Sequence, residues 1–538
     1  MPGVAGVVQG AAGDPARACV AAYPHREAVQ ARHRESTRRR VEEAAAMSWS
    51  ERLAELAEFK RRYHAHGSDR AKKRNTERGK LLARERMAYL CDEGSFTELA
   101  GPAHEAGRNT AAVDEPEAPG DGVVTGVGLV VGQPVCVQAD DGTVFGGARG
   151  TTGARKIERL KRLSIERGYP YVALLEGSAG RIQESIGATS AFVGAGFRTQ
   201  MELRAAVPTV AAIMGKCFGG PAFYAALSDY VPMVAGTGFL AMSGPSVIRA
   251  GTGHQLTEDE IGGPAMQEAG TGMVDYVATD DADCLASIRT FLTYVGAAGR
   301  PTADPADRQV PELVETVAER FTKPYDMLQV LRGVLDDGDF FELKSGHARN
   351  LVTGLGAFDG IPVGIVASQP NRKAGVLDTK SSVKVKNFLD LCQRRRLPVV
   401  FFQDVPGFIV GLDAEREGQV RYAAELLCAV AGVTTPKITL ILRKSFGLSY
   451  LALGGKAMGA DFVYAWPGAE IGLMGPEAAA RTILGPGATV DELAKATDDY
   501  RAQMSPYIAA GDAYLDDVIA PAGTRQVVCR ALTLAGAR

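Results

Sequence analysis

An internal repeat is the sequence feature that most constrains how this chain can fold. When the sequence is aligned with itself, glycines, prolines and several other residues recur at one offset of 228 positions. Val124-Thr125-Gly126-Val127-Gly128 meets Val352-Thr353-Gly354-Leu355-Gly356, and the same register pairs Lys156 with Lys384, Pro170 with Pro398, Pro208 with Pro436 and Gly219 with Gly447. Beyond that point the register slips by three, so that Ser243–Pro245 meets Met474–Pro476. A shared register of this length predicts two homologous lobes.

The alternation of short apolar runs with helical segments in each repeat indicates the fold class. Short apolar runs such as 207–214 and 398–402 are bounded by Gly and Pro and alternate with helical segments, which is typical of α/β lobes. Residues 299–311 are rich in Pro and small residues, as an interdomain linker often is. We therefore expect a disordered extension at 1–47, a first lobe at 48–304 and a second lobe at 305–538.

The first hundred residues carry two helical patterns and a basic stretch. Apolar side chains recur at helical spacing over 49–63 and again over 81–90, which predicts two amphipathic helices. The basic residues between these helices (Lys72, Lys73, Arg74 and Arg78) read best as a solvated face. Residues 1–46 lack the apolar core of a secretory signal.

Composition narrows the classes of function. The longest apolar runs fall short of the 18 or so residues that a membrane helix needs, and beyond residue 90 the charge is acidic, so we expect neither a membrane span nor nucleic-acid binding. The 8 cysteines are dispersed without paired spacing, which indicates reduced thiols in a cytoplasmic protein and no zinc site.

Several catalytic motifs are missing. The sequence has no G-x-S-x-G elbow, no phosphate-binding P-loop and no dinucleotide-binding G-x-G-x-x-G, and only His254 and His347 lie beyond residue 104. What remains are small-residue turns after apolar runs: Gly146-Gly147, Gly177–Gly180, Gly219-Gly220 and Gly447–Ser449. Such turns can point backbone N–H groups at an oxyanion, although any one of them could simply close a strand-to-helix connection.

At these and other motifs the chain resembles the β-type carboxyltransferase subunits of propionyl-CoA and acetyl-CoA carboxylases, from about Ser48 to the C-terminus. The matching segments are Gly79–Arg86, Thr143–Gly147, Arg181–Glu184, Gly219–Ala222, Asp404–Phe408, Arg443-Lys444, Gly459–Asp461, Pro506–Ala510 and Asp516–Ile519. The resemblance implies a crotonase-like α/β fold in two tandem lobes, and transfer of a carboxylate from carboxybiotin to the α-carbon of an acyl-CoA.

The resemblance also implies the site residues. Backbone amides of Ser178 and Ala179, with Gly180, would hold the thioester oxyanion, and those of Leu448 and Ser449 the biotin oxyanion. Residues implied to bind acyl-CoA are Gly146, Gly147, Arg181, Phe218, Gly219 and Gly220. Gly447 and Tyr450 would flank biotin, and Leu451 would line the acyl pocket. No metal is implied.

The resemblance further implies partners and an assembly. The chain lacks the Met-Lys-Met acceptor for biotin, so biotin would arrive on a separate carrier subunit, charged by a biotin carboxylase. The family pattern implies a homohexamer in the cytoplasm, acting on a coenzyme A thioester.

Two departures keep other functions open. Leu448 replaces a small residue of the family motif, and Leu451 stands where relatives that use short acyl groups often have Asp. The first departure motivates a biotin-independent decarboxylase or acyl-processing enzyme acting on malonyl-type thioesters. A third possibility is a noncatalytic partner within a carboxylase assembly.

Overall fold

The computed structural model describes residues 47–106, 118–177, 180–181, 184, 187–188, 195–296 and 300–537. Apart from Met47, the expected N-terminal extension lies outside the described residues. The described chain forms two compact units, of which the smaller holds helix α2 (Trp49–Tyr63). A capping box between Ser48 and Glu51 begins this helix, and none of its residues is buried. The predicted helix over 49–63 is confirmed.

The larger unit begins with two short helices, α3 (Asp69–Glu77) and α4 (Ala83–Leu90). Helix α4 agrees with the second predicted helix and buries Met87 and Leu90. The basic stretch is itself helical, and Lys73, Arg74 and Arg78 in and beside α3 are exposed, as a solvated face requires.

The first sheet has seven strands in the order β1-β2-β3-β4-β5-β7-β9. The pairs β1/β2 and β2/β3 are antiparallel, and the remaining pairs are parallel. The strands are β1 (Thr97–Glu98), β2 (Val123–Val130), β3 (Gln133–Asp140), β4 (Tyr171–Leu175), β5 (Thr209–Ile213), β7 (Pro232–Val234) and β9 (Tyr276–Ala278). A separate two-stranded sheet pairs β6 (Lys216–Phe218) with β8 (Phe239–Ala241).

The second sheet follows the same plan, with the main order β10-β11-β12-β13-β14-β15-β17 and β16 beside β14. Its strands are β10 (Phe341–Leu343), β11 (Leu351–Phe358), β12 (Ile361–Ser368), β13 (Val399–Val405), β14 (Lys437–Phe446), β15 (Phe462–Ala465), β16 (Glu470–Gly472) and β17 (Asp517–Val518). Strands β11 and β12 begin and end 228 positions after β2 and β3, so the repeat in the sequence is a repeat of strands.

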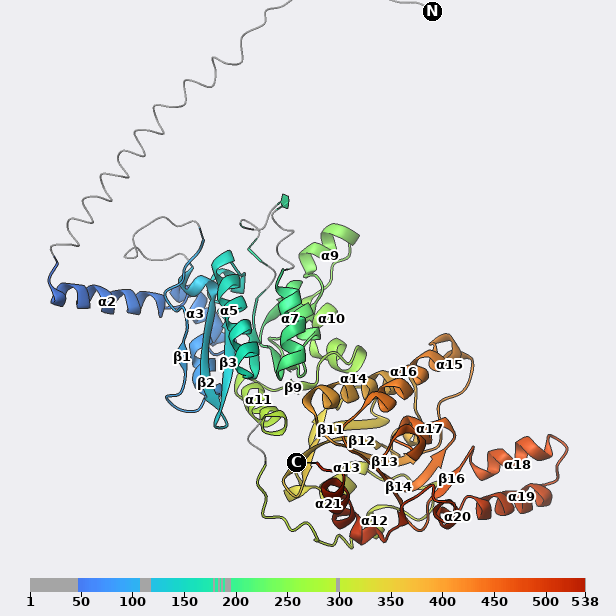
Figure 1. Ribbon diagram of the computed structural model, residues 1–538. Helices are drawn as coiled ribbons and strands as arrows, with labels where there is room; N and C mark the ends of the chain where they lie inside the picture. Colours follow the sequence, from blue (N-terminus) through green and yellow to red (C-terminus); the bar gives the residue numbers. More distant parts are fainter. Residues whose placement is uncertain are drawn as a thin grey trace, which may run out of the picture. The chain divides into compact units, whose positions relative to one another are not determined.

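Helices cover both sheets (Figure 1). With the first sheet go α5 (Thr151–Arg167), α7 (Ala195–Ala206), α8 (Gly220–Ala226), α9 (Pro245–Thr252), α10 (Glu258–Gly262) and α11 (Asp281–Val295). With the second go α12 (Leu313–Thr316), α13 (Met327–Val334), α14 (Thr379–Arg395), α15 (Leu412–Arg416), α16 (Gln419–Gly432), α17 (Leu448–Ala452), α18 (Pro476–Leu484), α19 (Val490–Gln503), α20 (Pro506–Gly511) and α21 (Thr524–Leu534). Helix α14 lies 228 positions after α5 at both ends.

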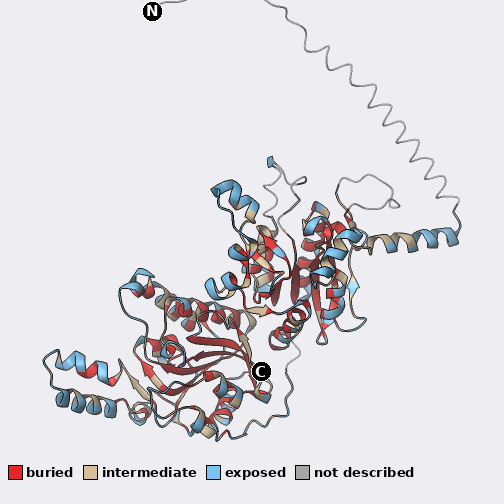
Figure 2. Cartoon of the chain, turned by 180° about the vertical axis from the view of Figure 1, so that it is seen from behind, coloured by how far each residue is buried: buried red, intermediate tan, exposed pale blue. Residues whose placement is uncertain are grey.

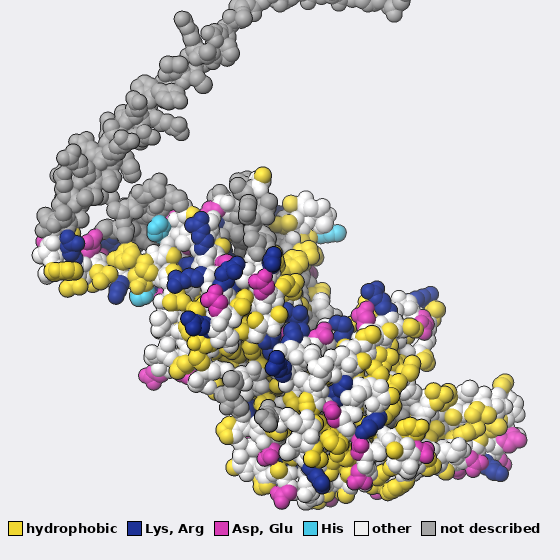
Figure 3. Space-filling model, viewed as in Figure 1, with side chains coloured by type: hydrophobic (Ala, Val, Ile, Leu, Met, Phe, Trp, Pro, Cys, Tyr) yellow, Lys and Arg dark blue, Asp and Glu magenta, His cyan; other side chains and the backbone are white. Residues whose placement is uncertain are grey.

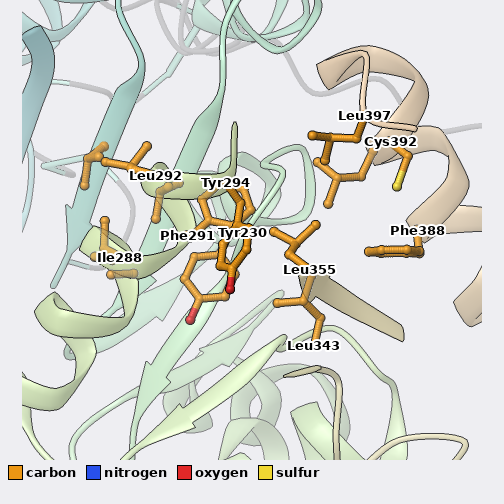
Figure 4. Packing of buried hydrophobic residues seen from close by; sticks show 14 of the residues in the cluster. Tyr230, Ile288, Phe291, Leu292, Tyr294, Leu343, Leu355, Phe388, Cys392 and Leu397 are labelled. Atoms are coloured by element: carbon orange, nitrogen blue, oxygen red, sulfur yellow. The ribbon is translucent and has the colours of Figure 1, made fainter. Parts of the chain in front are cut away.

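The sheets form the buried centre of each half (Figure 2). One hydrophobic cluster crosses from the first sheet to the second. In it Tyr230 stacks on Phe291, with ring centroids 4.7 Å apart, and meets the edge of Phe341 at 5.6 Å. Figure 4 shows Leu343 and Leu355 of the second sheet beside the rings of Tyr230 and Phe291. The two sheets therefore share part of their core.

Candidate active site

The turn at Gly447 links β14 to α17 through a conformation that favours glycine. Its φ is 64° and its ψ is −151°, and an added Cβ would lie 3.0 Å from the carbonyl oxygen of Leu473. Gly219 has a similar conformation (φ 72°, ψ −130°) where β6 meets α8. The repeat therefore places the same sharp turn in both halves.

Leu448 and Ser449 are the first two residues of α17, where helical N–H groups have no partner within the helix. Among the described residues, neither amide has a hydrogen-bond acceptor. The side chains differ, because Leu448 is 61% exposed whereas Ser449 is buried and donates its hydroxyl to the carbonyl of Phe446. Two amides are thus available beside an exposed isobutyl group.

Tyr450 and Leu451 continue the same helix. The hydroxyl of Tyr450 accepts a hydrogen bond from the backbone N–H of Lys456 at 3.0 Å, and burial raises the pKa of this phenol. Leu451 is half-buried. Tyr450 therefore holds the helix against the next turn, while the role of Leu451 stays a prediction.

The Gly146-Gly147 turn packs backbone to backbone against the end of β4. A Cβ on Gly147 (φ 76°) would lie 2.0 Å from the carbonyl oxygen of Glu176, and one on Gly177 would lie 2.1 Å from that of Gly147. Gly146 has φ 64° but open space around it. Gly147 and Gly177 must therefore be glycine because neighbouring backbone lies too close for a side chain, whereas Gly146 has room for one.

Of the predicted first-lobe amides, Ser178 and Ala179 lie outside the described residues, and Gly180 is half-buried. Arg181 is held by an ion pair with Asp121 at 2.9 Å and another with Glu184, and it lies over the ring of Phe145. The ion pairs with Asp121 and Glu184 thus fix the guanidinium of Arg181 beside this turn.

Phe218, Gly219 and Gly220 lie around the other first-lobe turn. Phe218 is buried, and Gly244 comes so close that a Cβ would lie 3.2 Å from its ring. The repeat-related pair, Phe446 and Gly475, has the same contact at 3.4 Å. A Cβ at Gly220 would meet open space, which explains why its counterpart can be Leu448.

The sequence reasoning missed a buried ionic cluster at the end of β4. Glu176 pairs with Lys80 and with Arg86, whose Nη1 lies 2.5 Å from Oε2, and Arg86 also pairs with Asp281 at 2.8 Å. Although burial opposes it, the charges of Glu176 and Asp281 raise the pKa of Arg86, whereas burial lowers the pKa of Lys80. The cluster holds the strand end two residues before Ser178.

The second sheet has a related arrangement at Asp404, 228 positions after Glu176. Asp404 pairs with Arg443 at 2.8 Å and Lys444 at 3.4 Å. Its N–H donates to Ser368, as the N–H of Glu176 donates to Asp140. Lys80, Arg86, Asp404, Arg443 and Lys444 all lie in the matching segments Gly79–Arg86, Asp404–Phe408 and Arg443-Lys444, but nothing in the sequence paired acids with bases.

The two histidines beyond residue 104 form no nucleophile–base pair with another described side chain. His254 is exposed, and His347 is buried against the carbonyl of Ala269, where burial lowers its pKa. Within the described ranges, no group of three or more His, Cys, Asp or Glu side chains is arranged to hold a metal ion. What the described loops offer chemically is backbone amides.

Neither a hydrogen bond nor a ring contact between described residues connects the Leu448-Ser449 turn with the turns of the first sheet. The turns at Ser178 and Leu448 also follow different strands of the repeat, β4 and β14.

Comparisons with known proteins match most of the chain. The model of the carboxyl transferase domain family matches residues 74–538. The propionyl-CoA carboxylase carboxyltransferase subunit of Haloferax mediterranei is 38% identical, with 89% of this chain and 95% of that protein covered. Methylmalonyl-CoA decarboxylase subunit alpha of Veillonella parvula is 35% identical, with 90% and 96% covered.

A solved structure of transcarboxylase 12S, described as a hexamer assembly with methylmalonyl-coenzyme A bound, matches with a TM-score of 0.86 and 35% identity. It covers 91% of this chain and 97% of its own.

Proposed function

The chain belongs to the carboxyl transferase domain family, and from this premise we propose that it transfers a carboxylate from carboxybiotin to the α-carbon of an acyl-CoA. The predicted membership is confirmed, as is the predicted α/β fold of two tandem crotonase-like lobes, and the chain is an enzyme, a carboxyltransferase. The observation that carries the detailed proposal is the pair of unpartnered amides at Leu448 and Ser449.

The amides act by holding negative charge. Cleavage of the N–C bond of carboxybiotin would release CO2 and leave a ureido anion, which takes the α-proton of the acyl-CoA. The resulting enolate attacks the CO2 and forms the new C–C bond. N–H donors aimed at the thioester oxygen favour the enolate, each by about 3 to 4 kcal/mol. We assign the thioester oxygen to the amides of Ser178 and Ala179, with Gly180 shaping the turn. Their neighbours Gly146, Gly147, Arg181, Phe218, Gly219 and Gly220 would bind the rest of the acyl-CoA.

We assign the ureido oxygen of biotin to the second turn. Leu448 and Ser449 present two adjacent N–H groups, and Gly447 supplies the sharp turn that aims them. Biotin on a carrier subunit would supply the carboxylate, while Tyr450 holds the helix and Leu451 lines the acyl pocket. No metal enters this proposal.

The test is transfer in a reconstituted system. The purified chain is supplied with a biotin carboxylase, a biotinylated carrier, ATP, bicarbonate and either acetyl-CoA or propionyl-CoA. We expect carboxylated acyl-CoA to form only when all components are present, and Leu448→Gly to change the KM for the carrier rather than for acyl-CoA. Absence of transfer with every acyl-CoA tried contradicts the proposal.

A second candidate function is decarboxylation of a malonyl-type thioester without biotin. The exposed isobutyl group of Leu448 favours it, because that group stands beside the amides proposed for biotin, and a relative of similar identity is named as a decarboxylase subunit. Release of CO2 from malonyl-CoA or methylmalonyl-CoA in the absence of any biotinylated protein would select this function. A chain that binds no acyl-CoA in calorimetry would instead be a noncatalytic partner.

We also propose that the chain works as a homohexamer with separate biotin carboxylase and carrier subunits in the cytoplasm. Exposed apolar side chains support an assembly, since Leu473, Ile483 and Val490 around α18 and α19 are each more than half exposed. Figure 3 shows hydrophobic atoms gathered over α18 and near α16 and α17. A facing protomer would bring a first-lobe turn (48–304) to a second-lobe turn (305–538). No described helix is both long and apolar enough to cross a membrane.

A further inference from the structure

A polar cavity of about 180 Å3 lies where the first sheet's helices meet α14. Among its lining residues are Arg204 at the end of α7, Asp229 before β7, and Asn387 and Arg394 on α14. Arg204 comes just before β5 and Arg394 just before β13, so the cavity lies at the amino ends of the parallel strands. The proposed active-site turns lie at their carboxyl ends, so this cavity is separate from them.

The cavity holds more positive than negative charge. Arg394 and Arg395 both pair with Asp229, at 2.9 Å and 3.2 Å, and Asp229 also accepts from the N–H and hydroxyl of Thr209. The two other acids of the lining, Asp275 and Asp390, are paired with Lys344 and Lys386. One carboxylate is therefore shared by two guanidinium groups.

Arg204 is the third guanidinium of this region and is half-buried. Within the described residues its side chain makes no hydrogen bond or ion pair, and its Nε is buried from solvent. The Nε of Arg395 is likewise buried without a hydrogen bond, although it lies near Asp229. Burial lowers the pKa of Arg204, the charge of Arg394 lowers it further, and the charges of Asp229 and Asp390 act in the opposite direction. Asp229 and Asp390 partly offset the charge of Arg204, but neither carboxylate bonds its buried Nε, and an anion in the cavity would supply that hydrogen bond.

We propose that this cavity binds a small oxyanion, with inorganic phosphate as its model ligand, held by Arg204 and Arg394. The volume is below the roughly 300 Å3 at which pockets for drug-sized ligands begin, which fits a phosphate rather than a nucleotide. Because the ligand bridges residues of α7 and α14, its binding stabilises the contact between the two halves of the protein. The proposal does not depend on the reaction at the active-site turns.

The test compares thermal unfolding of the full chain in about 10 mM phosphate and in chloride at equal ionic strength. For the wild type we expect phosphate to raise the midpoint by about 2 to 4 °C. Arg204→Met should lose this gain yet unfold no earlier than the wild type in chloride, since it removes an unpaired charge. Arg167→Met, on the exposed end of α5, is the matched control and should keep the whole gain.

A second variant keeps the test decisive if Arg204→Met does not fold. Asn387→Asp places a carboxylate at the exposed rim of the cavity, so it should raise the midpoint in chloride and reduce the phosphate gain. A wild type that phosphate does not stabilise would overturn the proposal, as would equal gains in the wild type and in whichever variants fold.

Discussion

Lys156 and Lys384 show at the residue scale what the repeat preserves. Both ammonium groups are buried, and each donates to the carbonyl of the first residue of the repeated strand: Lys156 to Val123 at 2.6 Å, and Lys384 to Leu351 at 2.8 Å. Lys156 also bonds the carbonyl of Gly120. An ammonium group has three donors and suits several carbonyls at once. The identity of these lysines in the sequence therefore reflects a structural requirement.

Lys161 gives a prediction about pH. It is buried over the ring of Tyr224, 4.0 Å from the centroid, and burial lowers its pKa to about 7, against about 10.4 in an unfolded chain. Between these values the unfolded chain binds more protons, so this group makes stability rise as pH rises from about 7 to 10. From pH 7 to 9 the wild type should gain on the order of 2 kcal/mol in free energy of unfolding over Lys161→Met.

Urea unfolding at the two pH values measures this difference. Lys73→Met, on an exposed position of α3, controls for the loss of a surface lysine and should follow the wild type at both pH values. Parallel pH profiles for Lys161→Met and the wild type would show that Lys161 does not titrate in this range.

The glycines at 146 and 147 give a matched pair of substitutions. Gly146→Ala meets only the cost of a left-handed conformation, about 1 to 2 kcal/mol. Gly147→Ala adds a clash with the carbonyl of Glu176, so the turn must move, and we expect it to lose at least about 3 kcal/mol of stability and most of its acyl-CoA affinity. Chemical unfolding and calorimetric titration with acyl-CoA would measure both. Equal losses in the two variants would refute the argument from close packing.

At the scale of elements, equivalent strands of the two sheets each end in a buried carboxylate paired with two basic side chains, although the basic residues differ. Glu176 ends β4 against Lys80 and Arg86, while Asp404 near the end of β13 pairs with Arg443 and Lys444. The sequence predicted the glycine turns because glycine marks them directly. It could not predict these clusters, since Lys80 and Arg86 lie about ninety positions before Glu176 and only folding brings them together. Ser178 and Ala179, predicted from the family motif, stay a prediction.

Glu176→Gln tests what the first cluster contributes. Removing one buried charge leaves Arg86 and Lys80 undercompensated, which typically costs about 3 to 5 kcal/mol. Because the cluster is two residues from Ser178, we expect kcat to fall in addition. Asp404→Asn is the matched variant of the second half: it should lose similar stability and alter the KM for the biotinylated carrier. If Glu176→Gln kept both its stability and its kcat, the cluster would have no role in holding the turn.

At the scale of the whole molecule, the repeat predicted two lobes correctly but not how they share a core. Glycines and prolines that recur in the repeat report on each lobe's own strands, and the predicted crotonase-like fold in two lobes is confirmed. The contact between the halves depends on Tyr230, Phe291 and Phe341, which occupy no matching positions in the repeat. The lobe boundary near residue 305 stays a prediction. A shared cluster implies that the halves unfold together.

Phe341→Ala should separate their unfolding. The ring of Phe341, on β10, meets those of Tyr230 at 5.6 Å and Tyr294 at 6.4 Å, so its removal takes away contacts between the two sheets. Of the two tryptophans, Trp49 is exposed and Trp466 is buried in the second half, so a change in fluorescence reports mainly on that half. Circular dichroism at 222 nm reports on all helices. In the wild type the two signals should change at the same guanidinium concentration, whereas in Phe341→Ala they should part.

The matched control is Phe462→Ala, which removes a partly buried ring that stacks on Tyr464 within the second half alone. It should lower the midpoint and leave the two signals coincident, because it weakens one half without touching the contact between them. Measurements at one fixed protein concentration keep the contribution of subunit assembly constant across the variants. If both variants kept coincident signals, the cluster around Tyr230 would not be what makes the two halves unfold as one.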